Sequence, residues 1–239
     1  MLHRVLARTR AQLHLQQRRA FSNALNGTVG FVGVGNMGMS MAANLAKKGC
    51  NVAFTDINPD SPGVKHVKEA GGNFYGSLEE VCAQNLTSLV TAVDSPATVR
   101  KLYLGDTGII GYSVKNGNAP VLIDCSTVDP KTALDVQAEA SAKGMAFVDS
   151  PMSGGVPGAS AGTLSFMVGG SDTDFELVKP VLLLMGANVY HCGGTSTGQA
   201  AKLCNNLILA ATMLGTAEGF RLGTTFTFYV CNHRHVFQN

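Results

Sequence analysis

The stretch that decides the fold is GFVGVGNMG, residues Gly30–Gly38. Its glycine pattern begins at Gly33, directly after a short apolar run at 29–32, and opens into a helical repeat of apolar residues at 37–48, which ends at Gly49. This order predicts a strand, a glycine-rich turn and a helix with a glycine cap. The first turn of such a helix offers free N–H groups and a partial positive charge to an anionic ligand.

Three glycines of this stretch match the pattern G-x-G-x-x-G, and each has a physical role. Gly33 permits the tight turn, Gly35 lets the backbone approach a pyrophosphate, and Gly38 lets the helix pack closely on the strand. Asp56 follows the next predicted strand, 51–55, and lies 23 residues after Gly33. Its carboxylate can bind both ribose hydroxyls of NAD and would repel the 2′-phosphate of NADP. The pattern therefore predicts an NAD site.

Apolar runs of strand length alternate with helical repeats as far as about residue 194. Further strands are predicted at 86–93, 121–125, 146–149, 164–168 and 188–191, and helices after the capping pattern of Ser77 and Glu80, at 131–143 and at 172–185. This alternation predicts a Rossmann-type, doubly wound and mainly parallel α/β sheet that is covered on both faces. We assign residues 27–194 to this domain, 195–222 to one long helix and 223–239 to a divergent tail.

The composition excludes several classes of protein. The 239 residues are 45% hydrophobic and 14% charged, which excludes a disordered chain. The longest apolar run, Leu207–Ala217, is shorter than a membrane helix requires. Five of the 18 basic residues lie in residues 1–24, so the remainder has 13 basic against 16 acidic residues. We therefore expect neither a nucleic-acid partner nor a membrane partner.

Residues 1–24 form a basic leader, MLHRVLARTRAQLHLQQRRAFSNA, and the first acidic residue of the chain is Asp56. Arginines and leucines without acidic residues are typical of a mitochondrial transit peptide, which predicts a matrix location. An untargeted basic tail is the alternative.

The cysteine pattern predicts neither a disulfide framework nor a metal centre. The six cysteines include no CxxC pair, and most lie in apolar runs, so we expect buried, reduced thiols. Cys231, His233 and His235 crowd together in the tail and could suggest a metal site, but such crowding in a tail is usually chance and we predict no metal site.

Residues 150–170, SPMSGGVPGASAGTLSFMVGG, are rich in glycine and small side chains. Ser153, Gly154 and Gly155 offer backbone N–H groups and a hydroxyl, which together can bind a carboxylate. An ordinary flexible loop is the alternative reading.

The segment 193–206, GGTSTGQAAKLCNN, begins the long predicted helix, which runs from Gln199 to about Arg221. Gln199, Lys202 and Asn206 share one face of that helix by their spacing. Desolvation would lower the pKa of Lys202 toward neutrality, which suits proton transfer. The alternative is a lysine that reaches into solvent.

Together, the segments 30–49, 123–130, 150–170 and 194–219 resemble the β-hydroxyacid dehydrogenase family in order and spacing, over roughly residues 28–222. The resemblance implies oxidation of a small 3-hydroxy acid to its semialdehyde by hydride transfer to NAD, in a homo-oligomer. It implies cofactor contacts from Gly33, Val34, Gly35, Asn36, Met37, Gly38, Asp56, Val93, Asp94, Thr98 and Thr127, substrate contacts from Ser153, Gly154, Gly155 and Asn206, and proton transfer by Lys202.

The chain departs from the family pattern in two places. Asp94 stands where the family has the proline of a Met-Leu-Pro-like turn, and its charge would weaken NAD binding. The resemblance stops near 221–223, whereas the family continues into an all-helical domain that closes the site and forms the dimer. We expect a shortened chain whose long helix exposes an apolar face. A reductase of another small semialdehyde and an inactive NAD-binding fragment therefore stay open as alternatives.

Overall fold

The computed structural model describes residues 27–226. The predicted transit peptide at 1–24 and most of the tail, including Cys231, His233 and His235, lie outside the described residues. The chain divides into two compact units, Met1–Lys202 and Leu203–Asn239.

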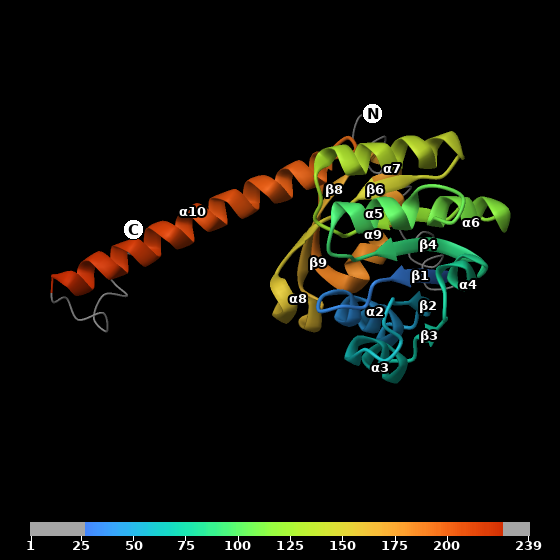
Figure 1. The fold of residues 1–239 in the computed structure, drawn as a ribbon, viewed down its shortest axis with the longest axis horizontal. Coiled ribbons are helices and arrows are strands. Elements are labelled where there is room, and N and C mark those ends of the chain that lie inside the picture. The colour runs from blue at the N-terminus through green and yellow to red at the C-terminus, as the bar shows by residue number, and fades with distance from the viewer. Residues whose placement is uncertain (1–26, 227–239) are drawn as a thin grey trace, which may run out of the picture. The chain divides into compact units, whose positions relative to one another are not determined.

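The first unit contains one mixed sheet in the order β3-β2-β1-β4-β5-β6-β8-β7, with β9 paired to β8 (Figure 1). Its strands are β1 (Thr28–Val32), β2 (Asn51–Thr55), β3 (Asn73–Phe74), β4 (Leu86–Thr91), β5 (Val121–Asp124), β6 (Phe147–Asp149), β7 (Met152–Ser153), β8 (Leu164–Gly169) and β9 (Gly186–Gly193). All pairings are parallel except β6 with β8 and β7 with β8. The predicted Rossmann-type, mainly parallel sheet is confirmed.

The helices are α2 (Gly38–Lys47), α3 (Pro62–Glu69), α4 (Leu78–Cys82), α5 (Pro96–Tyr103), α6 (Ile109–Lys115), α7 (Pro130–Ala142), α8 (Gly155–Ala161), α9 (Asp172–Met185) and α10 (Thr197–Thr225). The predicted helices 37–48 and 131–143 correspond to α2 and α7, and the predicted helix 172–185 has the bounds of α9. The sequence analysis assigned no helix to the residues of α3, α5 and α6.

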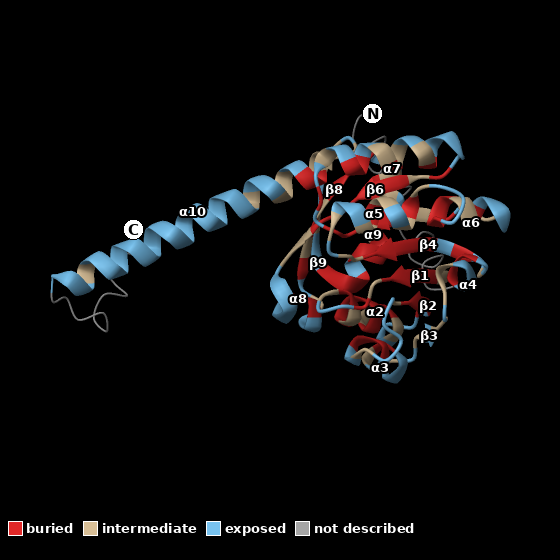
Figure 2. Ribbon diagram, in the orientation of Figure 1, coloured by how far each residue is buried: buried red, intermediate tan, exposed pale blue. Residues whose placement is uncertain are grey.

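Strand residues alternate between two apolar cores, one on each face of the sheet. Leu122 and Phe147 face the core beneath α4, α5, α6 and α7, whereas Ile123 and Val148 face the core that α2 and α9 cover. The strands β1, β2, β4, β5 and β6 are buried almost throughout (Figure 2), whereas β9 is mostly exposed. Burial on both faces explains why these strands appear in the sequence as continuous apolar runs.

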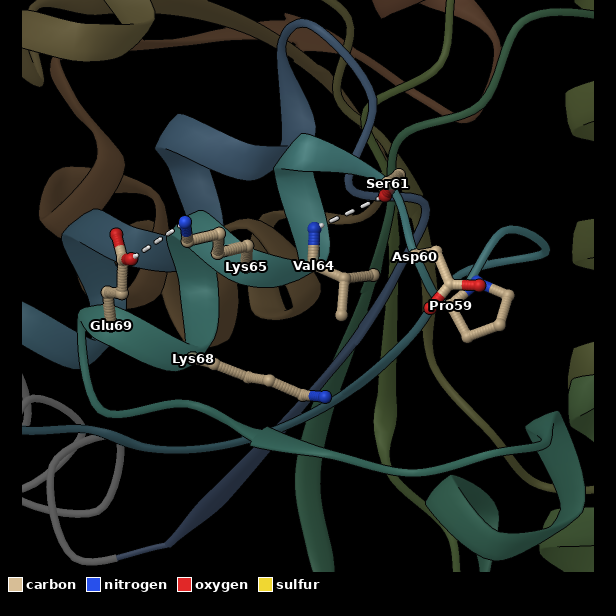
Figure 3. A pocket seen from close by; sticks show the side chains of 7 residues that line it. All are labelled: Pro59, Asp60, Ser61, Val64, Lys65, Lys68 and Glu69. Atoms are coloured by element: carbon tan, nitrogen blue, oxygen red, sulfur yellow. Dashed lines mark hydrogen bonds and ion pairs between the residues drawn. The ribbon is translucent and has the colours of Figure 1, made fainter.

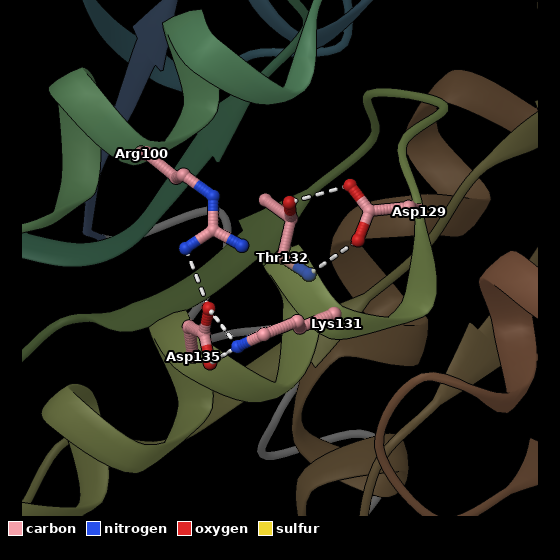
Figure 4. A network of polar contacts seen from close by, with 5 residues as sticks. All are labelled: Arg100, Asp129, Lys131, Thr132 and Asp135. Carbon is pink, nitrogen blue, oxygen red and sulfur yellow. Dashed lines mark hydrogen bonds and ion pairs between the residues drawn. The ribbon is translucent and has the colours of Figure 1, made fainter.

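A polar network on the surface joins α5 to α7 (Figure 4). Arg100 Nη1 lies 2.5 Å from Asp135 Oδ2, and Lys131 Nζ lies 3.0 Å from Asp135 Oδ1. Asp129 caps α7 by accepting the N–H and the hydroxyl of Thr132 at 3.0 and 2.7 Å. Because these groups are partly exposed, solvent screens each ion pair, and we expect only a small contribution to stability.

Residues 150–170 are not an open loop, so the flexible-loop alternative is wrong. Met152 and Ser153 form β7, which pairs with β8, and residues 155–161 form α8. This local order gives Ser153 a defined position opposite Ser165 of β8.

The cysteine prediction is confirmed only in part. Among residues 27–226, Cys50, Cys82 and Cys125 are buried free thiols, whereas Cys192 is half-buried and Cys204 is exposed. Burial raises the pKa of Cys82 to about 12, so its thiol stays protonated and inert.

Candidate functional site

The last residues of five strands lie in one row at the carboxyl edge of the sheet. Thr55 of β2 pairs with Val32 of β1, Val32 with Thr91 of β4, Thr91 with Asp124 of β5, and Asp124 with Asp149 of β6. The chain passes from β1 to β2 on one side, while β4 lies on the other side. This reversal is the place where open α/β sheets bind ligands. Most of the predicted site residues follow directly after this row.

The glycine loop after β1 has the backbone that the motif predicts. Gly33 has φ +90°, and a Cβ there would lie 2.5 Å from the carbonyl oxygen of Ala92. A Cβ on Gly38 would overlap the carbonyl oxygen of Gly33. The predicted roles of these two glycines, a tight turn and close packing, are confirmed. A Cβ on Gly35 would meet no atom within 4 Å, so the loop leaves open space where the motif places a pyrophosphate.

Asp56 directly follows β2 and is held toward the same loop. Its Oδ2 accepts the N–H of Val34 at 2.7 Å, and its Oδ1 accepts the N–H of Asn58 at 3.0 Å. Two backbone donors therefore orient the carboxylate, and further lone pairs of its oxygens remain for a ribose. Asn36 is exposed and Met37 is half-buried just before α2.

The segment after β4 contains the residue that departs from the family pattern. Asp94 is exposed, and its Oδ1 accepts the hydroxyl of Thr98 at 3.0 Å. Ser95 caps α5 by accepting the N–H of Thr98 at 3.2 Å. Asp94 therefore lies at a helix N-terminus, which favours a negative charge. Val93 donates its N–H to Ser126 Oγ at 3.0 Å, and this bond joins the segment to the one after β5.

The segment after β5 presents Thr127 on the surface while its neighbours are buried. Asp124, at the end of β5, accepts the hydroxyl of Thr91 at 2.8 Å and the N–H of Ser126 at 3.0 Å. Burial raises the pKa of Asp124 to about 6, and the negative charge of Asp149 acts in the same direction.

The predicted carboxylate-binding residues lie where β7 passes into α8. Ser153 is half-buried in β7. Gly154 has φ +134° and Gly155 has φ +61°, conformations that side-chain-bearing residues rarely adopt. The two glycines turn the chain sharply between β7 and α8.

Two residues near the start of α10, Gln199 and Lys202, were predicted to share a face but differ in environment. Gln199 is fully buried, whereas Lys202 is half-buried. Desolvation lowers the pKa of Lys202, in the predicted direction. Asn206 belongs to the second unit and is exposed, so its substrate contact stays a prediction. Further along α10, apolar side chains are exposed as expected, among them Leu207, Ile208, Met213 and Leu214.

Sequence reasoning missed one residue of this edge, Asp149. Its fully buried carboxylate accepts the backbone N–H groups of Ser196 at 2.6 Å and Gln199 at 2.8 Å. An acidic residue at the end of an apolar strand was the signal used for Asp56, and it applies equally to Asp149.

The hollow in Figure 3 lies along α3, whose first turn packs against Val34 of the glycine loop. It has a volume of about 310 Å³ and is lined by Pro59, Asp60, Ser61, Val64, Lys65, Lys68 and Glu69. Lys65 and Glu69 are largely exposed and 4.0 Å apart. The hollow contains none of the predicted site residues, so we do not assign it to the site.

Residues 27–226 contain no candidate metal centre and no candidate membrane span. Within this range, no three His, Cys, Asp or Glu side chains are grouped so that they could hold a metal ion. In the same part of the chain, no helix is both long and apolar enough to cross a membrane.

A family model described as the NAD binding domain of 6-phosphogluconate dehydrogenase matches residues 28–194. The chain belongs to the β-hydroxyacid dehydrogenase family. Membership confirms the resemblance found in the motifs and shows that the first unit contains an NAD(P)-binding domain.

Several relatives in this family share the name 3-hydroxyisobutyrate dehydrogenase. The chain is 43% identical to the probable mitochondrial protein of Dictyostelium discoideum, covering 86% of this chain and 62% of the relative. It is also 43% identical to the mitochondrial protein of Mus musculus and to the protein of Pseudomonas aeruginosa, covering 82% of this chain and 56% and 63% of those relatives. The chain thus spans about three fifths of their length. Mitochondrial and bacterial relatives are equally similar to it.

A solved structure shares the fold. The 3-hydroxyisobutyrate dehydrogenase of Mycobacterium tuberculosis, solved with L-serine, superposes with a TM-score of 0.77 at 34% identity. The match covers 85% of this chain and 67% of that one.

Proposed function

We propose that this chain is a 3-hydroxyisobutyrate dehydrogenase that oxidises 3-hydroxyisobutyrate to methylmalonate semialdehyde with NAD. The observation that carries the proposal is the half-buried Lys202 on a helix whose first turn is bonded to the nucleotide-binding edge of the sheet. The names of the relatives at 43% identity support the substrate.

The residues of the chain fit the cofactor. The open side of Gly35 accommodates a pyrophosphate, and Asp56 is oriented to accept the ribose hydroxyls. The carboxylate of Asp56 would repel a 2′-phosphate, so we propose NAD rather than NADP. When bound, NAD supplies the acceptor for the hydride that leaves the carbinol carbon of the substrate.

In this proposal, Lys202 moves the proton. Its neutral amine takes the proton of the substrate hydroxyl during oxidation, and its ammonium form stabilises the developing oxyanion in the reverse direction. The lowered pKa of Lys202 increases the neutral fraction of its amine at a given pH. Ser153, Gly154 and Gly155 bind the substrate carboxylate through a hydroxyl and backbone N–H groups, and Asn206 orients the substrate.

We place the reaction in valine breakdown in the mitochondrial matrix. The arginine-rich residues 1–24 and the mitochondrial relatives support the location. By the family resemblance, the active form is a homo-oligomer.

A second candidate is an NAD-binding chain without turnover. The specific observation in its favour is that the chain spans only 56% to 63% of the length of these curated relatives. Oxidation or reduction of another small substrate of the same class is a variant of the main proposal.

The test is NADH formation by the full chain with NAD and 3-hydroxyisobutyrate, compared with Lys202→Ala and with Lys143→Ala, which removes an exposed lysine from the end of α7. We expect a saturable rate that falls by about 10²-fold or more in Lys202→Ala only, with NADH binding retained. A wild-type chain that binds NADH but turns over no small hydroxy acid supports the second candidate. An equal rate in Lys202→Ala overturns the role of that lysine.

A further inference from the structure

The buried side chain of Gln199 bonds to the peptide groups on both sides of Thr127. Its Nε2 donates to the carbonyl oxygen of Ser126 at 2.8 Å, and its Oε1 accepts the N–H of Val128 at 3.0 Å. Gln199 has no exposed surface, whereas Thr127, between its two partners, is exposed. The side-chain amide of Gln199 thus holds the turn at 126–128. Within this turn only the side chain of Thr127, the predicted cofactor contact, is exposed.

The backbone N–H of Gln199 is held by Asp149, at the end of β6. The N–H groups of Gln199 and Ser196 both donate to the buried carboxylate of Asp149. Ser196 has φ +77°, the single positive φ of a non-glycine residue within 27–226. A left-handed serine costs free energy and persists where its surroundings hold it, and the Asp149 carboxylate provides that hold.

Close backbone contacts leave the first turn of α10 no room to move. A Cβ on Gly198 would overlap the carbonyl oxygen of Met167 and lie 2.9 Å from the carbonyl oxygen of Asp149. A Cβ on Gly169 would lie 2.5 Å from Asp149 Oδ1 and 2.8 Å from the backbone nitrogen of Gly198. The ends of β6 and β8 therefore fix where α10 begins.

We propose that Gln199 and Asp149 are positioning residues that set the amine of Lys202 relative to Thr127. Lys202 lies three residues beyond Gln199, close to one turn along the same helix, so its distance from the Thr127 turn depends on the Gln199 amide. The contacts continue through Ser126, whose Oγ accepts the N–H of Val93. The inference rests on the proposed function, because it assigns Thr127 to the cofactor and Lys202 to proton transfer.

The hydrogen-bond pattern makes this role specific to an amide or to a protonated carboxyl. The side chain must donate to one peptide group and accept from the other. A carboxylate can only accept, so it would face the Ser126 carbonyl without a donor, whereas a protonated carboxyl can do both. Gln199→Glu therefore keeps both bonds at low pH and loses one when the buried carboxyl ionises.

The experiment measures the affinity of the full chain for NADH from pH 5 to pH 9, in the wild type and in Gln199→Glu. The control variant is Gln137→Glu on the surface of α7, where the side chain of Gln137 donates to the hydroxyl of Ser141. We expect Gln199→Glu to match the wild type at the low end and to bind roughly tenfold more weakly at the high end, the size of one lost buried hydrogen bond. The control should follow the wild type throughout. If turnover is measurable, kcat should fall with the same pH dependence.

Each other outcome overturns either the positioning role or the proposed function. Equal affinity at every pH, or a loss that does not change with pH, overturns the positioning role. A wild type that does not bind NADH overturns the proposed function itself, and the inference falls with it. If Gln199→Glu does not fold, amide hydrogen exchange of the wild type decides: NADH must raise the protection of Val128 and Gln199 together, and protection of Val128 alone overturns the coupling.

Discussion

Replacing Asp124 with asparagine removes a buried negative charge from the end of β5. The carboxyl group is fully buried, and burial raises its pKa from 3.8 to about 6. The hydroxyl of Thr91 and the N–H of Ser126 both donate to Oδ1, and the amide oxygen of asparagine can accept both. Asp124→Asn therefore tests the charge with little change in shape.

The direction in which the unfolding free energy changes with pH follows from proton linkage. The folded state holds the proton of Asp124 more tightly than the unfolded state, so the wild type loses unfolding free energy as the pH rises from about 4 through about 6. The difference between 3.8 and about 6 corresponds to about 3 kcal/mol over the full range, of which about 1 kcal/mol falls between pH 5 and pH 7. Because the variant cannot ionise, its stability relative to the wild type rises by these amounts.

The assay is urea unfolding of both proteins at several pH values between 5 and 7. Asp129→Asn is a control whose stability relative to the wild type should stay constant in this range, because the hydrogen bonds from Thr132 lower the pKa of Asp129 from its ordinary value of 3.8. The contribution of that carboxylate is complete above its unfolded pKa and is lost only as the pH falls below about 4. Unfolding free energies of the wild type and Asp124→Asn that change in parallel with pH would refute the reasoning.

Three further changes test the backbone and the site. Gly198→Ala should destabilise the fold by about 1–3 kcal/mol in urea unfolding, because its Cβ would overlap the carbonyl oxygen of Met167; an unchanged midpoint contradicts this. Gly35→Ala should leave the unfolding midpoint unchanged and weaken NADH binding in titration, because its Cβ enters only the open space of the loop. Asp56→Asn should raise the affinity for NADPH relative to NADH, and an unchanged ratio excludes Asp56 as the discriminating group.

Sequence reasoning located the elements that have clear local boundaries. The bounds of β2 and α9 agree with the prediction because an apolar pattern ends at an acidic residue or a glycine in each case. Helices α3 and α5 were missed although Ser61–Pro62 and Ser95–Pro96 are N-cap and first-turn pairs, with each serine oxygen accepting an N–H at 3.2 Å. Their short apolar faces gave too weak a period to outweigh the surrounding polar residues.

The site residues that could be predicted belong to local motifs, whereas those that were missed depend on contacts between distant parts of the chain. The glycine loop and Asp56 were predictable because the motif specifies its own backbone. The role of Gln199 was not, because its partners lie 71 and 73 residues earlier in the chain, and Asp149 is 50 residues from Gln199. Helical spacing placed Gln199 on a face with Lys202, but spacing alone does not show that the side chain turns inward.

The boundary between the two compact units falls directly after Lys202. The proposed proton-transferring amine is therefore part of the nucleotide-binding unit and is anchored there by Asp149 and Gln199. A chimera joined at residue 203 would inherit the lysine together with its complete anchor, whatever chain followed. For protein engineering, the proposed cofactor, carboxylate-binding and proton-transfer residues would move together as one cassette, and of the proposed site residues only Asn206 lies beyond the joint.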